Sequence, residues 1–556
     1  MGRTLFWYIF KDLLRIFFLT SGALAGIMSF AGLLRPLTQQ GLDLSQVGEI
    51  LGYFMPAMTT YSLPVAALFA TTLVYGRLGA DNEIIACRAA GISHLALTLP
   101  AFLLGVCVSL MSLLLLCFVV PALMMQAERV VFSNVARIVA TAIDRTHQIQ
   151  IDSGGERVTV FARDALTLPP DPDRPRDQAV QLIAPTIVTF GPRTREDGLR
   201  VPRDFWMAER ATAYITPDED SDELSMMAVL EGGTKFPRST AGSTQGGIGY
   251  TRFGPIPFPS LVRENPRFMD IRRLFELLRD PGQSRRVRTV LREFIRAEQR
   301  MVFYRQIQEE LNGSECLLSN ETESYTLEAP GAAMRVEEGQ FIAESPRGQR
   351  LVRLTQDRAG AAVFRVEARR LRLTALPDGA RKLNYLTLEL EDAIVRAGAG
   401  HESERAVFPR ALAIAMSPEL LALESRDARF YRNHPTVLPE QQKTLRRHVT
   451  VITNSMLGEA HARASFSLSC LILVLVGCAL GMMFRSGNFM SAFAVSVVPA
   501  LICIALIVTG QHTCENVPRE LTAENNPLDL GLGLIWSGNI AVFLIAAVLL
   551  GRLQRQ

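Results

Sequence analysis

Residues 95–126 read LALTLPAFLLGVCVSLMSLLLLCFVVPALMMQ, a stretch without a single charged side chain. An α-helix rises about 1.5 Å per residue, so about 20 apolar residues cross the hydrocarbon core of a bilayer. The stretch exceeds this minimum, which predicts a membrane-spanning helix that is tilted or kinked. The rest of the sequence is therefore interpreted as that of a membrane protein.

Five further charge-free stretches are long enough to span a bilayer. They are residues 16–34, 50–75, 464–484, 489–510 and 530–551. The first follows Arg3, Lys11 and Arg15, as in a signal peptide, but its apolar run continues well past a possible cleavage site. We therefore expect a retained helix, and six spans in all.

Charge is distributed unevenly between the spans and the rest of the chain. The 556 residues are 48% hydrophobic and 20% charged, with a mean hydropathy of +0.18. Soluble proteins normally contain about 25% charged residues along their whole length, whereas here the charges concentrate in residues 126–463. We predict three spans in residues 1–125, a soluble β-rich domain in 126–458 and three spans in 459–556.

Lysine and arginine in the short loops predict the orientation of the chain. With a cytoplasmic N-terminus, the inner segments contain Arg3, Lys11, Arg15, Arg77, Arg88, Arg485, Arg552 and Arg555. The short outer loops contain Arg35 and Arg519. This asymmetry places both termini in the cytoplasm and the soluble domain outside it.

The inserted domain begins with a pattern typical of β-strands. Apolar and polar residues alternate in residues 147–151, 157–162, 180–190, 210–215 and 224–230. Short strands separated by turn signals predict a sandwich or jelly-roll-like sheet. Gly22 with Gly26, and Gly477 with Gly481, form G-x-x-x-G pairs in two of the spans, which suggests close helix packing there.

In the second part of the insert, the spacing of apolar residues changes from the alternation of strands to the spacing of helices. Apolar residues recur at helical spacing in residues 269–311, which predicts amphipathic helices within the insert. A second strand-like region, 322–395, and polar helices in 417–458 follow. A degenerate repeat of a β-region followed by helices is one interpretation.

Several classes of function are disfavoured. No Walker A motif is present, so the chain does not bind ATP through a P-loop. The span centres lack Asp, Glu, Lys and Arg, which argues against an ion-coupled transporter. The net charge of +3, without a basic patch interleaved with aromatic residues, argues against nucleic acid as a partner. No Cys-x-x-Cys or Cys/His cluster suggests a metal, and we expect no cofactor.

The loop after the second span reads YGRLGADNEIIACRAAGIS in residues 75–93. Its apolar residues follow helical spacing, with Asp81 or Asn82 as a possible N-cap and Gly91 as a helix end. We expect a short helix near residues 78–92 on the cytoplasmic surface. An ordinary amphipathic connector would have the same pattern.

The longer stretch 63–100, LPVAALFATTLVYGRLGADNEIIACRAAGISHLALTLP, closely resembles the LptF/LptG permease family. Members are the transmembrane subunits of the ABC exporter that removes lipopolysaccharide from the bacterial inner membrane. The resemblance rests on Gly-Arg-Leu, an acidic patch and Arg-Ala-x-Gly. It extends to Glu459-Ala-His461-Ala-Arg463-Ala464 and to Trp536-Ser-Gly-Asn539. The insert departs from the family by being much longer than a single jelly roll needs.

The resemblance implies one half of a heterodimeric permease. Its partners would be a separate ABC ATPase, a second LptF/LptG-type permease, a periplasmic bridge protein and lipopolysaccharide or a related lipid. Asp81, Glu83, Arg88 and Gly91 would contact the ATPase, with Glu83 making the main polar contact. The soluble domain would be periplasmic, and no bond would be made or broken by this chain.

Two alternative interpretations remain open for Arg35, for the cluster at residues 459–463 and for the function of the whole chain. Arg35 either contacts the phosphorylated headgroup of the transported lipid or extends to ordinary phospholipid headgroups. Glu459, His461 and Arg463 either form an enzyme site or, more simply, an interfacial polar cluster that anchors the fourth span. The chain itself is either a permease or a membrane-anchored scaffold or binding protein without transport activity.

The predicted orientation is testable by thiol labelling of whole cells. A cysteine introduced at Asp173 should react with a membrane-impermeant reagent, because the insert is expected outside the cytoplasm. Native Cys87, in the loop after the second span, should not react. Labelling of Cys87 together with protection of the introduced cysteine would overturn the orientation.

Overall fold

The computed structural model describes most of the chain. The described residues are 2–40, 44–132, 135–153, 156–169, 178–190, 202–217, 224–232, 234–237, 245–246, 250–257, 265–319, 324–337, 339–347, 349–358, 361–378, 382–397, 402–403, 412–434, 438–483, 489–518 and 525–555. Contacts divide the chain into two compact units. Unit 1 is Met1–Arg279 with Thr453–Gln556, and unit 2 is Asp280–Ile452.

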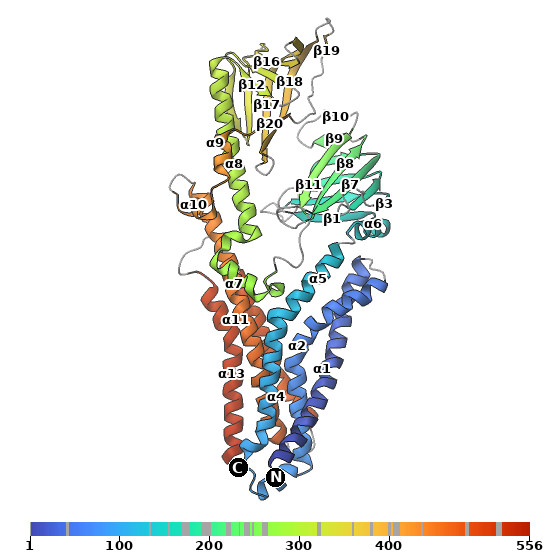
Figure 1. Cartoon of the computed structure of the whole chain (residues 1–556), viewed down its shortest axis with the longest axis vertical. Coiled ribbons are helices and arrows are strands. Elements are labelled where there is room, and N and C mark those ends of the chain that lie inside the picture. Colours follow the sequence, from blue (N-terminus) through green and yellow to red (C-terminus); the bar gives the residue numbers. More distant parts are fainter. Residues whose placement is uncertain are drawn as a thin grey trace. The chain divides into compact units, whose positions relative to one another are not determined.

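Six helices in the described part are long and apolar enough to cross a membrane, as predicted. They are formed by α1 (Gly2–Gln40), α2 (Leu44–Ala80), α4 (His94–Leu114) with the π-helix η1 (Leu115–Val119) and α5 (Val120–Phe132), α11 (Pro439–Met483), α12 (Phe489–Glu515) and α13 (Leu528–Arg555) (Figure 1). The helix that forms the fourth span, α11, begins at Pro439, well before the span predicted from residue 464. Its polar N-terminal half has good helix formers and no proline after the first position, so the helix continues without a break.

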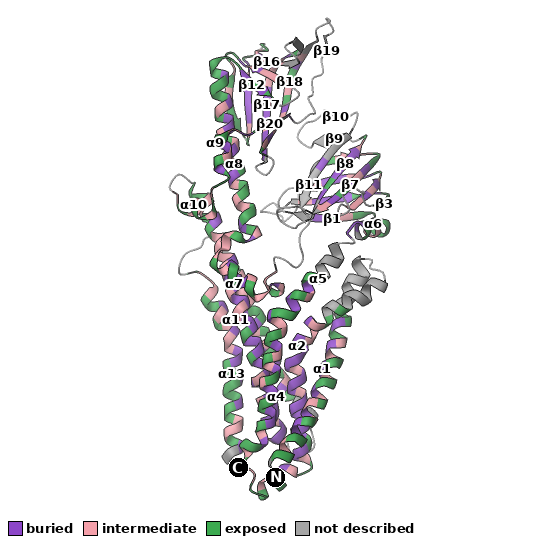
Figure 2. Cartoon of the chain, in the orientation of Figure 1, coloured by how far each residue is buried: buried purple, intermediate pink, exposed green. Residues whose placement is uncertain are grey.

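The spans are buried to different extents within this chain. The hydrophobic windows of the second and fourth spans are 67% and 78% buried, whereas those of the other four are 28–33% buried. Figure 2 shows this contrast between α2 and the more exposed α1 and α13. The second and fourth spans therefore form the centre of the bundle, and the others present apolar surface outward.

Glycines bring these two central helices together. A Cβ atom at Gly477 would lie 2.4 Å from Thr71 Oγ1, and one at Gly481 would lie 2.9 Å from the Cβ of Tyr75. Side chains at either position would clash, so the predicted packing face on the fourth span is confirmed. In the described part of the chain, nothing lies within 4 Å of a Cβ placed at Gly22 or Gly26. The close packing predicted for that pair is not made by these residues.

The first β-region, in unit 1, consists of two antiparallel sheets. Their orders are β1-β2-β5-β6-β9-β10 and β11-β8-β7-β4-β3. The strands are β1 (Gln148–Ser153), β2 (Glu156–Phe161), β3 (Asp164–Leu168), β4 (Gln178–Ile183), β5 (Thr186–Phe190), β6 (Pro202–Met207), β7 (Arg210–Pro217), β8 (Leu224–Glu231), β9 (Thr234–Pro237), β10 (Gln245–Gly246) and β11 (Tyr250–Pro257). Both sheets contribute side chains to one core, which fits the predicted sandwich or jelly-roll-like fold.

Two details of this region differ from the sequence prediction. The continuous strand predicted over 180–190 is wrong, because Ala184, with a φ of 50°, and Pro185 separate β4 from β5. Helix α6 (Val135–Thr146) also joins the core through Val139 and Ile143, which are 3% and 0% exposed. The core is therefore closed by a helix as well as by two sheets.

Unit 2 contains a second β-region with a different architecture. Its single antiparallel sheet has the order β12-β13-β16-β17-β15-β14, with β18 paired to β17, β19 and β20. The strands are β12 (Cys316–Ser319), β13 (Ser324–Glu328), β14 (Ala333–Glu337), β15 (Gln340–Glu344), β16 (Val352–Arg358), β17 (Ala361–Asp378), β18 (Leu383–Ala397), β19 (Glu402–Ser403) and β20 (Leu412–Ala415).

The shorter helices of the two units are α3 (Glu83–Ala89), η2 (Pro266–Phe268), α7 (Ile271–Arg279), η3 (Pro281–Gln283), α9 (Pro418–Leu423) and α10 (Ala428–Asn433).

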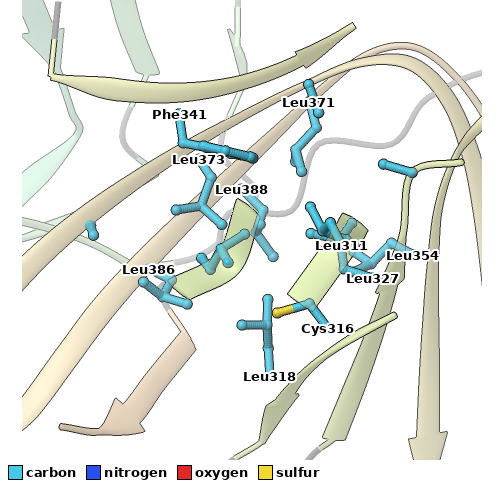
Figure 3. Close-up of a cluster of buried hydrophobic side chains, with 14 of the residues drawn as sticks. Leu311, Cys316, Leu318, Leu327, Phe341, Leu354, Leu371, Leu373, Leu386 and Leu388 are labelled. Carbon is cyan, nitrogen blue, oxygen red and sulfur yellow. The ribbon is translucent and has the colours of Figure 1, made fainter. Parts of the chain in front are cut away.

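A long helix, α8 (Arg285–Gly313), covers the apolar face of this sheet. Leu311 of α8 lies among Leu327, Leu354 and other strand residues in the core (Figure 3). The hydroxyl of Tyr304 donates to the carbonyl of Gly339 at 2.9 Å and accepts from the amide of Ala375 at 3.0 Å. A helix thus occupies the face that a second sheet occupies in the first β-region, which argues against a simple repeat.

The glycine contacts between α2 and α11 generate a stability prediction. Gly481→Leu should destabilise the purified chain by about 1–3 kcal/mol, because the new side chain has no space against α2. Gly22→Leu is the matched control and should have little effect. Thermal unfolding in detergent measures both, and equal unfolding midpoints for the two variants would contradict the packing described here.

Candidate functional site

Helix α3 joins the second and third spans. Asn82, at its N-cap, has a φ of 59°, and Gly91, just after the helix, has a φ of 84°. Asparagine and glycine adopt this left-handed conformation most readily, which explains these residues at the two turns. The helix lies within the predicted interval but is shorter, since residues 78–80 belong to α2. Asn82, rather than Asp81, occupies the N-cap.

One side of α3 is anchored to the bundle and the other is accessible. Ile84 is 8% exposed and belongs to the core formed by α1, α2, α4 and α11. Asp81 and Gly91 are exposed, and Glu83 and Arg88 are partly exposed. The four residues predicted to contact an ATPase therefore lie along one short surface loop with two accessible carboxylates.

A small hollow lies beneath this loop. It is lined by Gly79, Ile84, Ile85, Arg88, His94, Met482 and Leu553. Its volume of about 20 Å³ leaves room for about one water molecule. This hollow is therefore too small to hold a ligand of more than a few atoms.

The adjoining Gly-Arg-Leu motif has a packing role. Arg77 forms an ion pair and hydrogen bond with Asp12 of α1, and Leu78 is 3% exposed within the bundle core. A Cβ at Gly481 of α11 would lie 3.0 Å from the backbone nitrogen of Gly76. The motif therefore holds α1, α2 and α11 together next to α3.

Glu459 and Arg463 form a buried ion pair on α11. They are 6% and 2% exposed, and Arg463 Nε donates to Glu459 Oε1 at 2.8 Å. Gln511 of α12 donates from Nε2 to Glu459 Oε2 at 2.7 Å. The predicted cluster is therefore part of the interior of the chain, and Gln511 is a member that the sequence pattern did not indicate.

Arg463 also binds the backbone that follows the first β-region. Its Nη2 donates to the carbonyls of Pro266 at 2.9 Å and Met269 at 2.8 Å, with the carbonyl of Arg267 at 3.4 Å. We call residues 266–269 the linker. These bonds use Nε and Nη2 of the guanidinium group, while the buried Nη1 has no hydrogen-bond partner among the described residues.

His461 is not part of this arrangement. Trp536 Nε1 donates to His461 Nδ1 at 3.2 Å, and the two rings meet edge to face. His461 thus has its hydrogen-bond partner on α13, whereas Glu459 and Arg463 bond to each other, to Gln511 and to the linker. Among the described residues, no group of three or more His, Cys, Asp or Glu is placed to hold a metal.

The Trp-Ser-Gly-Asn stretch contributes further polar contacts between spans. Asn539 Nδ2 donates to the carbonyl and the hydroxyl of Ser465 at 2.7 and 2.8 Å. The Ser465 hydroxyl in turn donates to the carbonyl of Ile535 at 2.7 Å. These bonds tie α13 to α11.

Arg35, the remaining candidate residue, lies in α1, but its side chain is outside the described part of the structure. Its predicted contact with a lipid headgroup therefore stays a prediction.

Comparison with known proteins agrees with the arrangement of the spans and the loop between the second and third spans. Residues 7–165 and 336–552 match the protein family described as lipopolysaccharide export system permease LptF/LptG. The two segments cover most of the chain, and the unmatched residues 166–335 include α7 and α8. None of the curated proteins matches the chain. The chain therefore belongs to the LptF/LptG family of lipopolysaccharide export system permeases.

Proposed function

We propose that the chain is one of two permease subunits of an ABC exporter that extracts lipopolysaccharide, or a similar lipid, from the inner membrane. A separate ATPase supplies the energy, because no P-loop motif occurs in this sequence. Both termini are cytoplasmic, and the two β-regions are periplasmic. Family membership and the six spans support this assignment.

The observation that carries the proposal is the arrangement of α3. Ile84 anchors the helix to the bundle, so a force on α3 acts directly on the second and fourth spans. Asp81 and Glu83 remain accessible to a partner. We propose that α3 docks on the ATPase and that an arginine of the ATPase binds Glu83.

The proposed transport cycle uses movement rather than covalent chemistry. Closure of the ATPase pair rocks the spans and moves lipid out of an apolar cavity shared with the second permease. The outward apolar surface of the less buried spans provides the walls for such a cavity. The first β-region then receives the acyl chains and transfers them to a periplasmic bridge protein.

Substitution of Glu83 tests the coupling contact. A charge-assisted hydrogen bond to the ATPase contributes about 1.5–3 kcal/mol, so Glu83→Ala should weaken ATPase association by about 10- to 150-fold. Co-purification of the ATPase with the full-length chain measures this.

Glu515→Ala is the matched control. Glu515 is also a partly exposed glutamate, but it is the last residue of α12, next to the short outer loop that precedes the sixth span. Equal losses of ATPase from the two variants would exclude α3 as the coupling element. A scaffold protein without transport activity would retain no ATPase at all.

A second test concerns Arg35 and the lipid headgroup. The planar guanidinium group binds two phosphate oxygens at once, and the residue follows the first apolar span. A photo-crosslinking residue in place of Arg35 should therefore capture the exported lipid in a step that needs no ATP. Capture of bulk phospholipid alone would show that Arg35 only extends to the membrane surface.

A further inference from the structure

The linker is held on two sides. Phe268 packs against Ala57 of α2 and against Val120 and Met124 of α5. On the other side, its carbonyls accept hydrogen bonds from Arg463 of α11. The linker follows β11 in the sequence and precedes α7, so it is the covalent connection through which the first β-region continues into the rest of the chain.

The geometry of the guanidinium group matches the contacts of Arg463. Its Nε donates a hydrogen bond to Glu459, and its Nη2 donates to the carbonyls of Pro266 and Met269. A lysine has one compact ammonium group, so it lacks the separate, rigidly arranged N–H groups that bind the carboxylate and the carbonyls at the same time. Gln511 holds the second oxygen of Glu459, which orients the carboxylate and, through it, the guanidinium group.

The ion pair also restricts how its parts move. Both side chains are almost fully buried, at 6% and 2% exposure. Separating them would leave an uncompensated charge in a poorly solvated environment, which is strongly unfavourable. Because the ion pair stays closed, the guanidinium group of Arg463 moves together with α11. The linker carbonyls are hydrogen-bonded to this group.

We propose that Arg463 is a positioning residue that couples the linker to the fourth span, so that movement of α11 is passed to the first β-region. This inference rests on the proposed function, since movement of the spans during transport supplies the motion. In the linker, Arg463 donates hydrogen bonds to backbone carbonyls, so that displacement of α11 displaces the backbone that follows the first β-region.

The first part of the test measures the linker directly and needs no transport. Met269 is 8% exposed, and replacing it by cysteine leaves its carbonyl available to Arg463. In full-length protein in membranes, Met269→Cys should react slowly with a water-soluble maleimide, after subtraction of the labelling of the parent chain. Adding Glu459→Gln and Arg463→Gln together should raise the labelling rate several-fold.

The double substitution is chosen because it removes both charges at once. A single Arg463→Gln change leaves Glu459 buried and unpaired, and the chain then risks failing to fold. Glutamine has nearly the shape of glutamate, and at position 463 it is a shorter, uncharged polar side chain, so the ion pair is removed without leaving a buried charge. Arg279→Gln, at an exposed position at the end of α7, is the control and should leave the labelling rate unchanged.

The second part measures coupling in the assembled exporter. The double variant should retain ATP hydrolysis within about twofold, while lipid exported per ATP falls by about 5- to 150-fold, which corresponds to a typical coupling free energy of about 1–3 kcal/mol. Arg463→Lys, which keeps the charge but not the fork, should show an intermediate loss. A purely structural defect would instead lower hydrolysis and export together.

The outcomes separate this inference from the proposed function. An unchanged labelling rate in the double variant would show that Arg463 does not hold the linker. Faster labelling with unchanged export per ATP would show that the contact carries no movement. Absence of ATP-dependent export by the native chain would reject the proposed function, while the labelling result would still decide whether Arg463 holds the linker.

Discussion

Burying a carboxylate and a guanidinium group among membrane helices has a large desolvation cost, which a close pair with further hydrogen bonds must offset. Glu459 and Arg463 meet that condition by combining a 2.8 Å contact with each other, a bond from Gln511 and bonds to the linker carbonyls. The fourth span, the fifth span and the linker therefore meet at one point.

Close packing of small residues complements this polar contact along the membrane spans. Lipid tails are as apolar as leucine, so helices in a bilayer associate through close backbone approach and hydrogen bonds rather than through a hydrophobic driving force. Gly477 and Gly481 supply the close approach between α11 and α2, and Asn539 supplies hydrogen bonds between α13 and α11. The bundle thus has a well-packed centre, whereas its less buried helices keep apolar surface exposed.

The features that depend on length and composition were predictable from the sequence, and those that depend on tertiary contacts were not. Six spans follow from charge-free length, and the α3 loop follows from helical spacing between turn residues. The i,i+4 spacing of Glu459 and Arg463 was visible as a polar cluster. Its partners in the linker were not, because they are backbone carbonyls, which every residue has. The sheet of unit 2 was expected as strands, but no local pattern indicated that α8 covers its apolar face.

We propose that this chain converts movement of a separate ATPase into extraction of lipid. The most direct test of this proposal is release of lipopolysaccharide from proteoliposomes that contain the chain, the second permease and the ATPase, with a soluble bridge protein as acceptor. We predict release that requires ATP and stops when this chain is omitted. Equal release without this chain, or ATP hydrolysis by the complete complex without any release, would contradict the account.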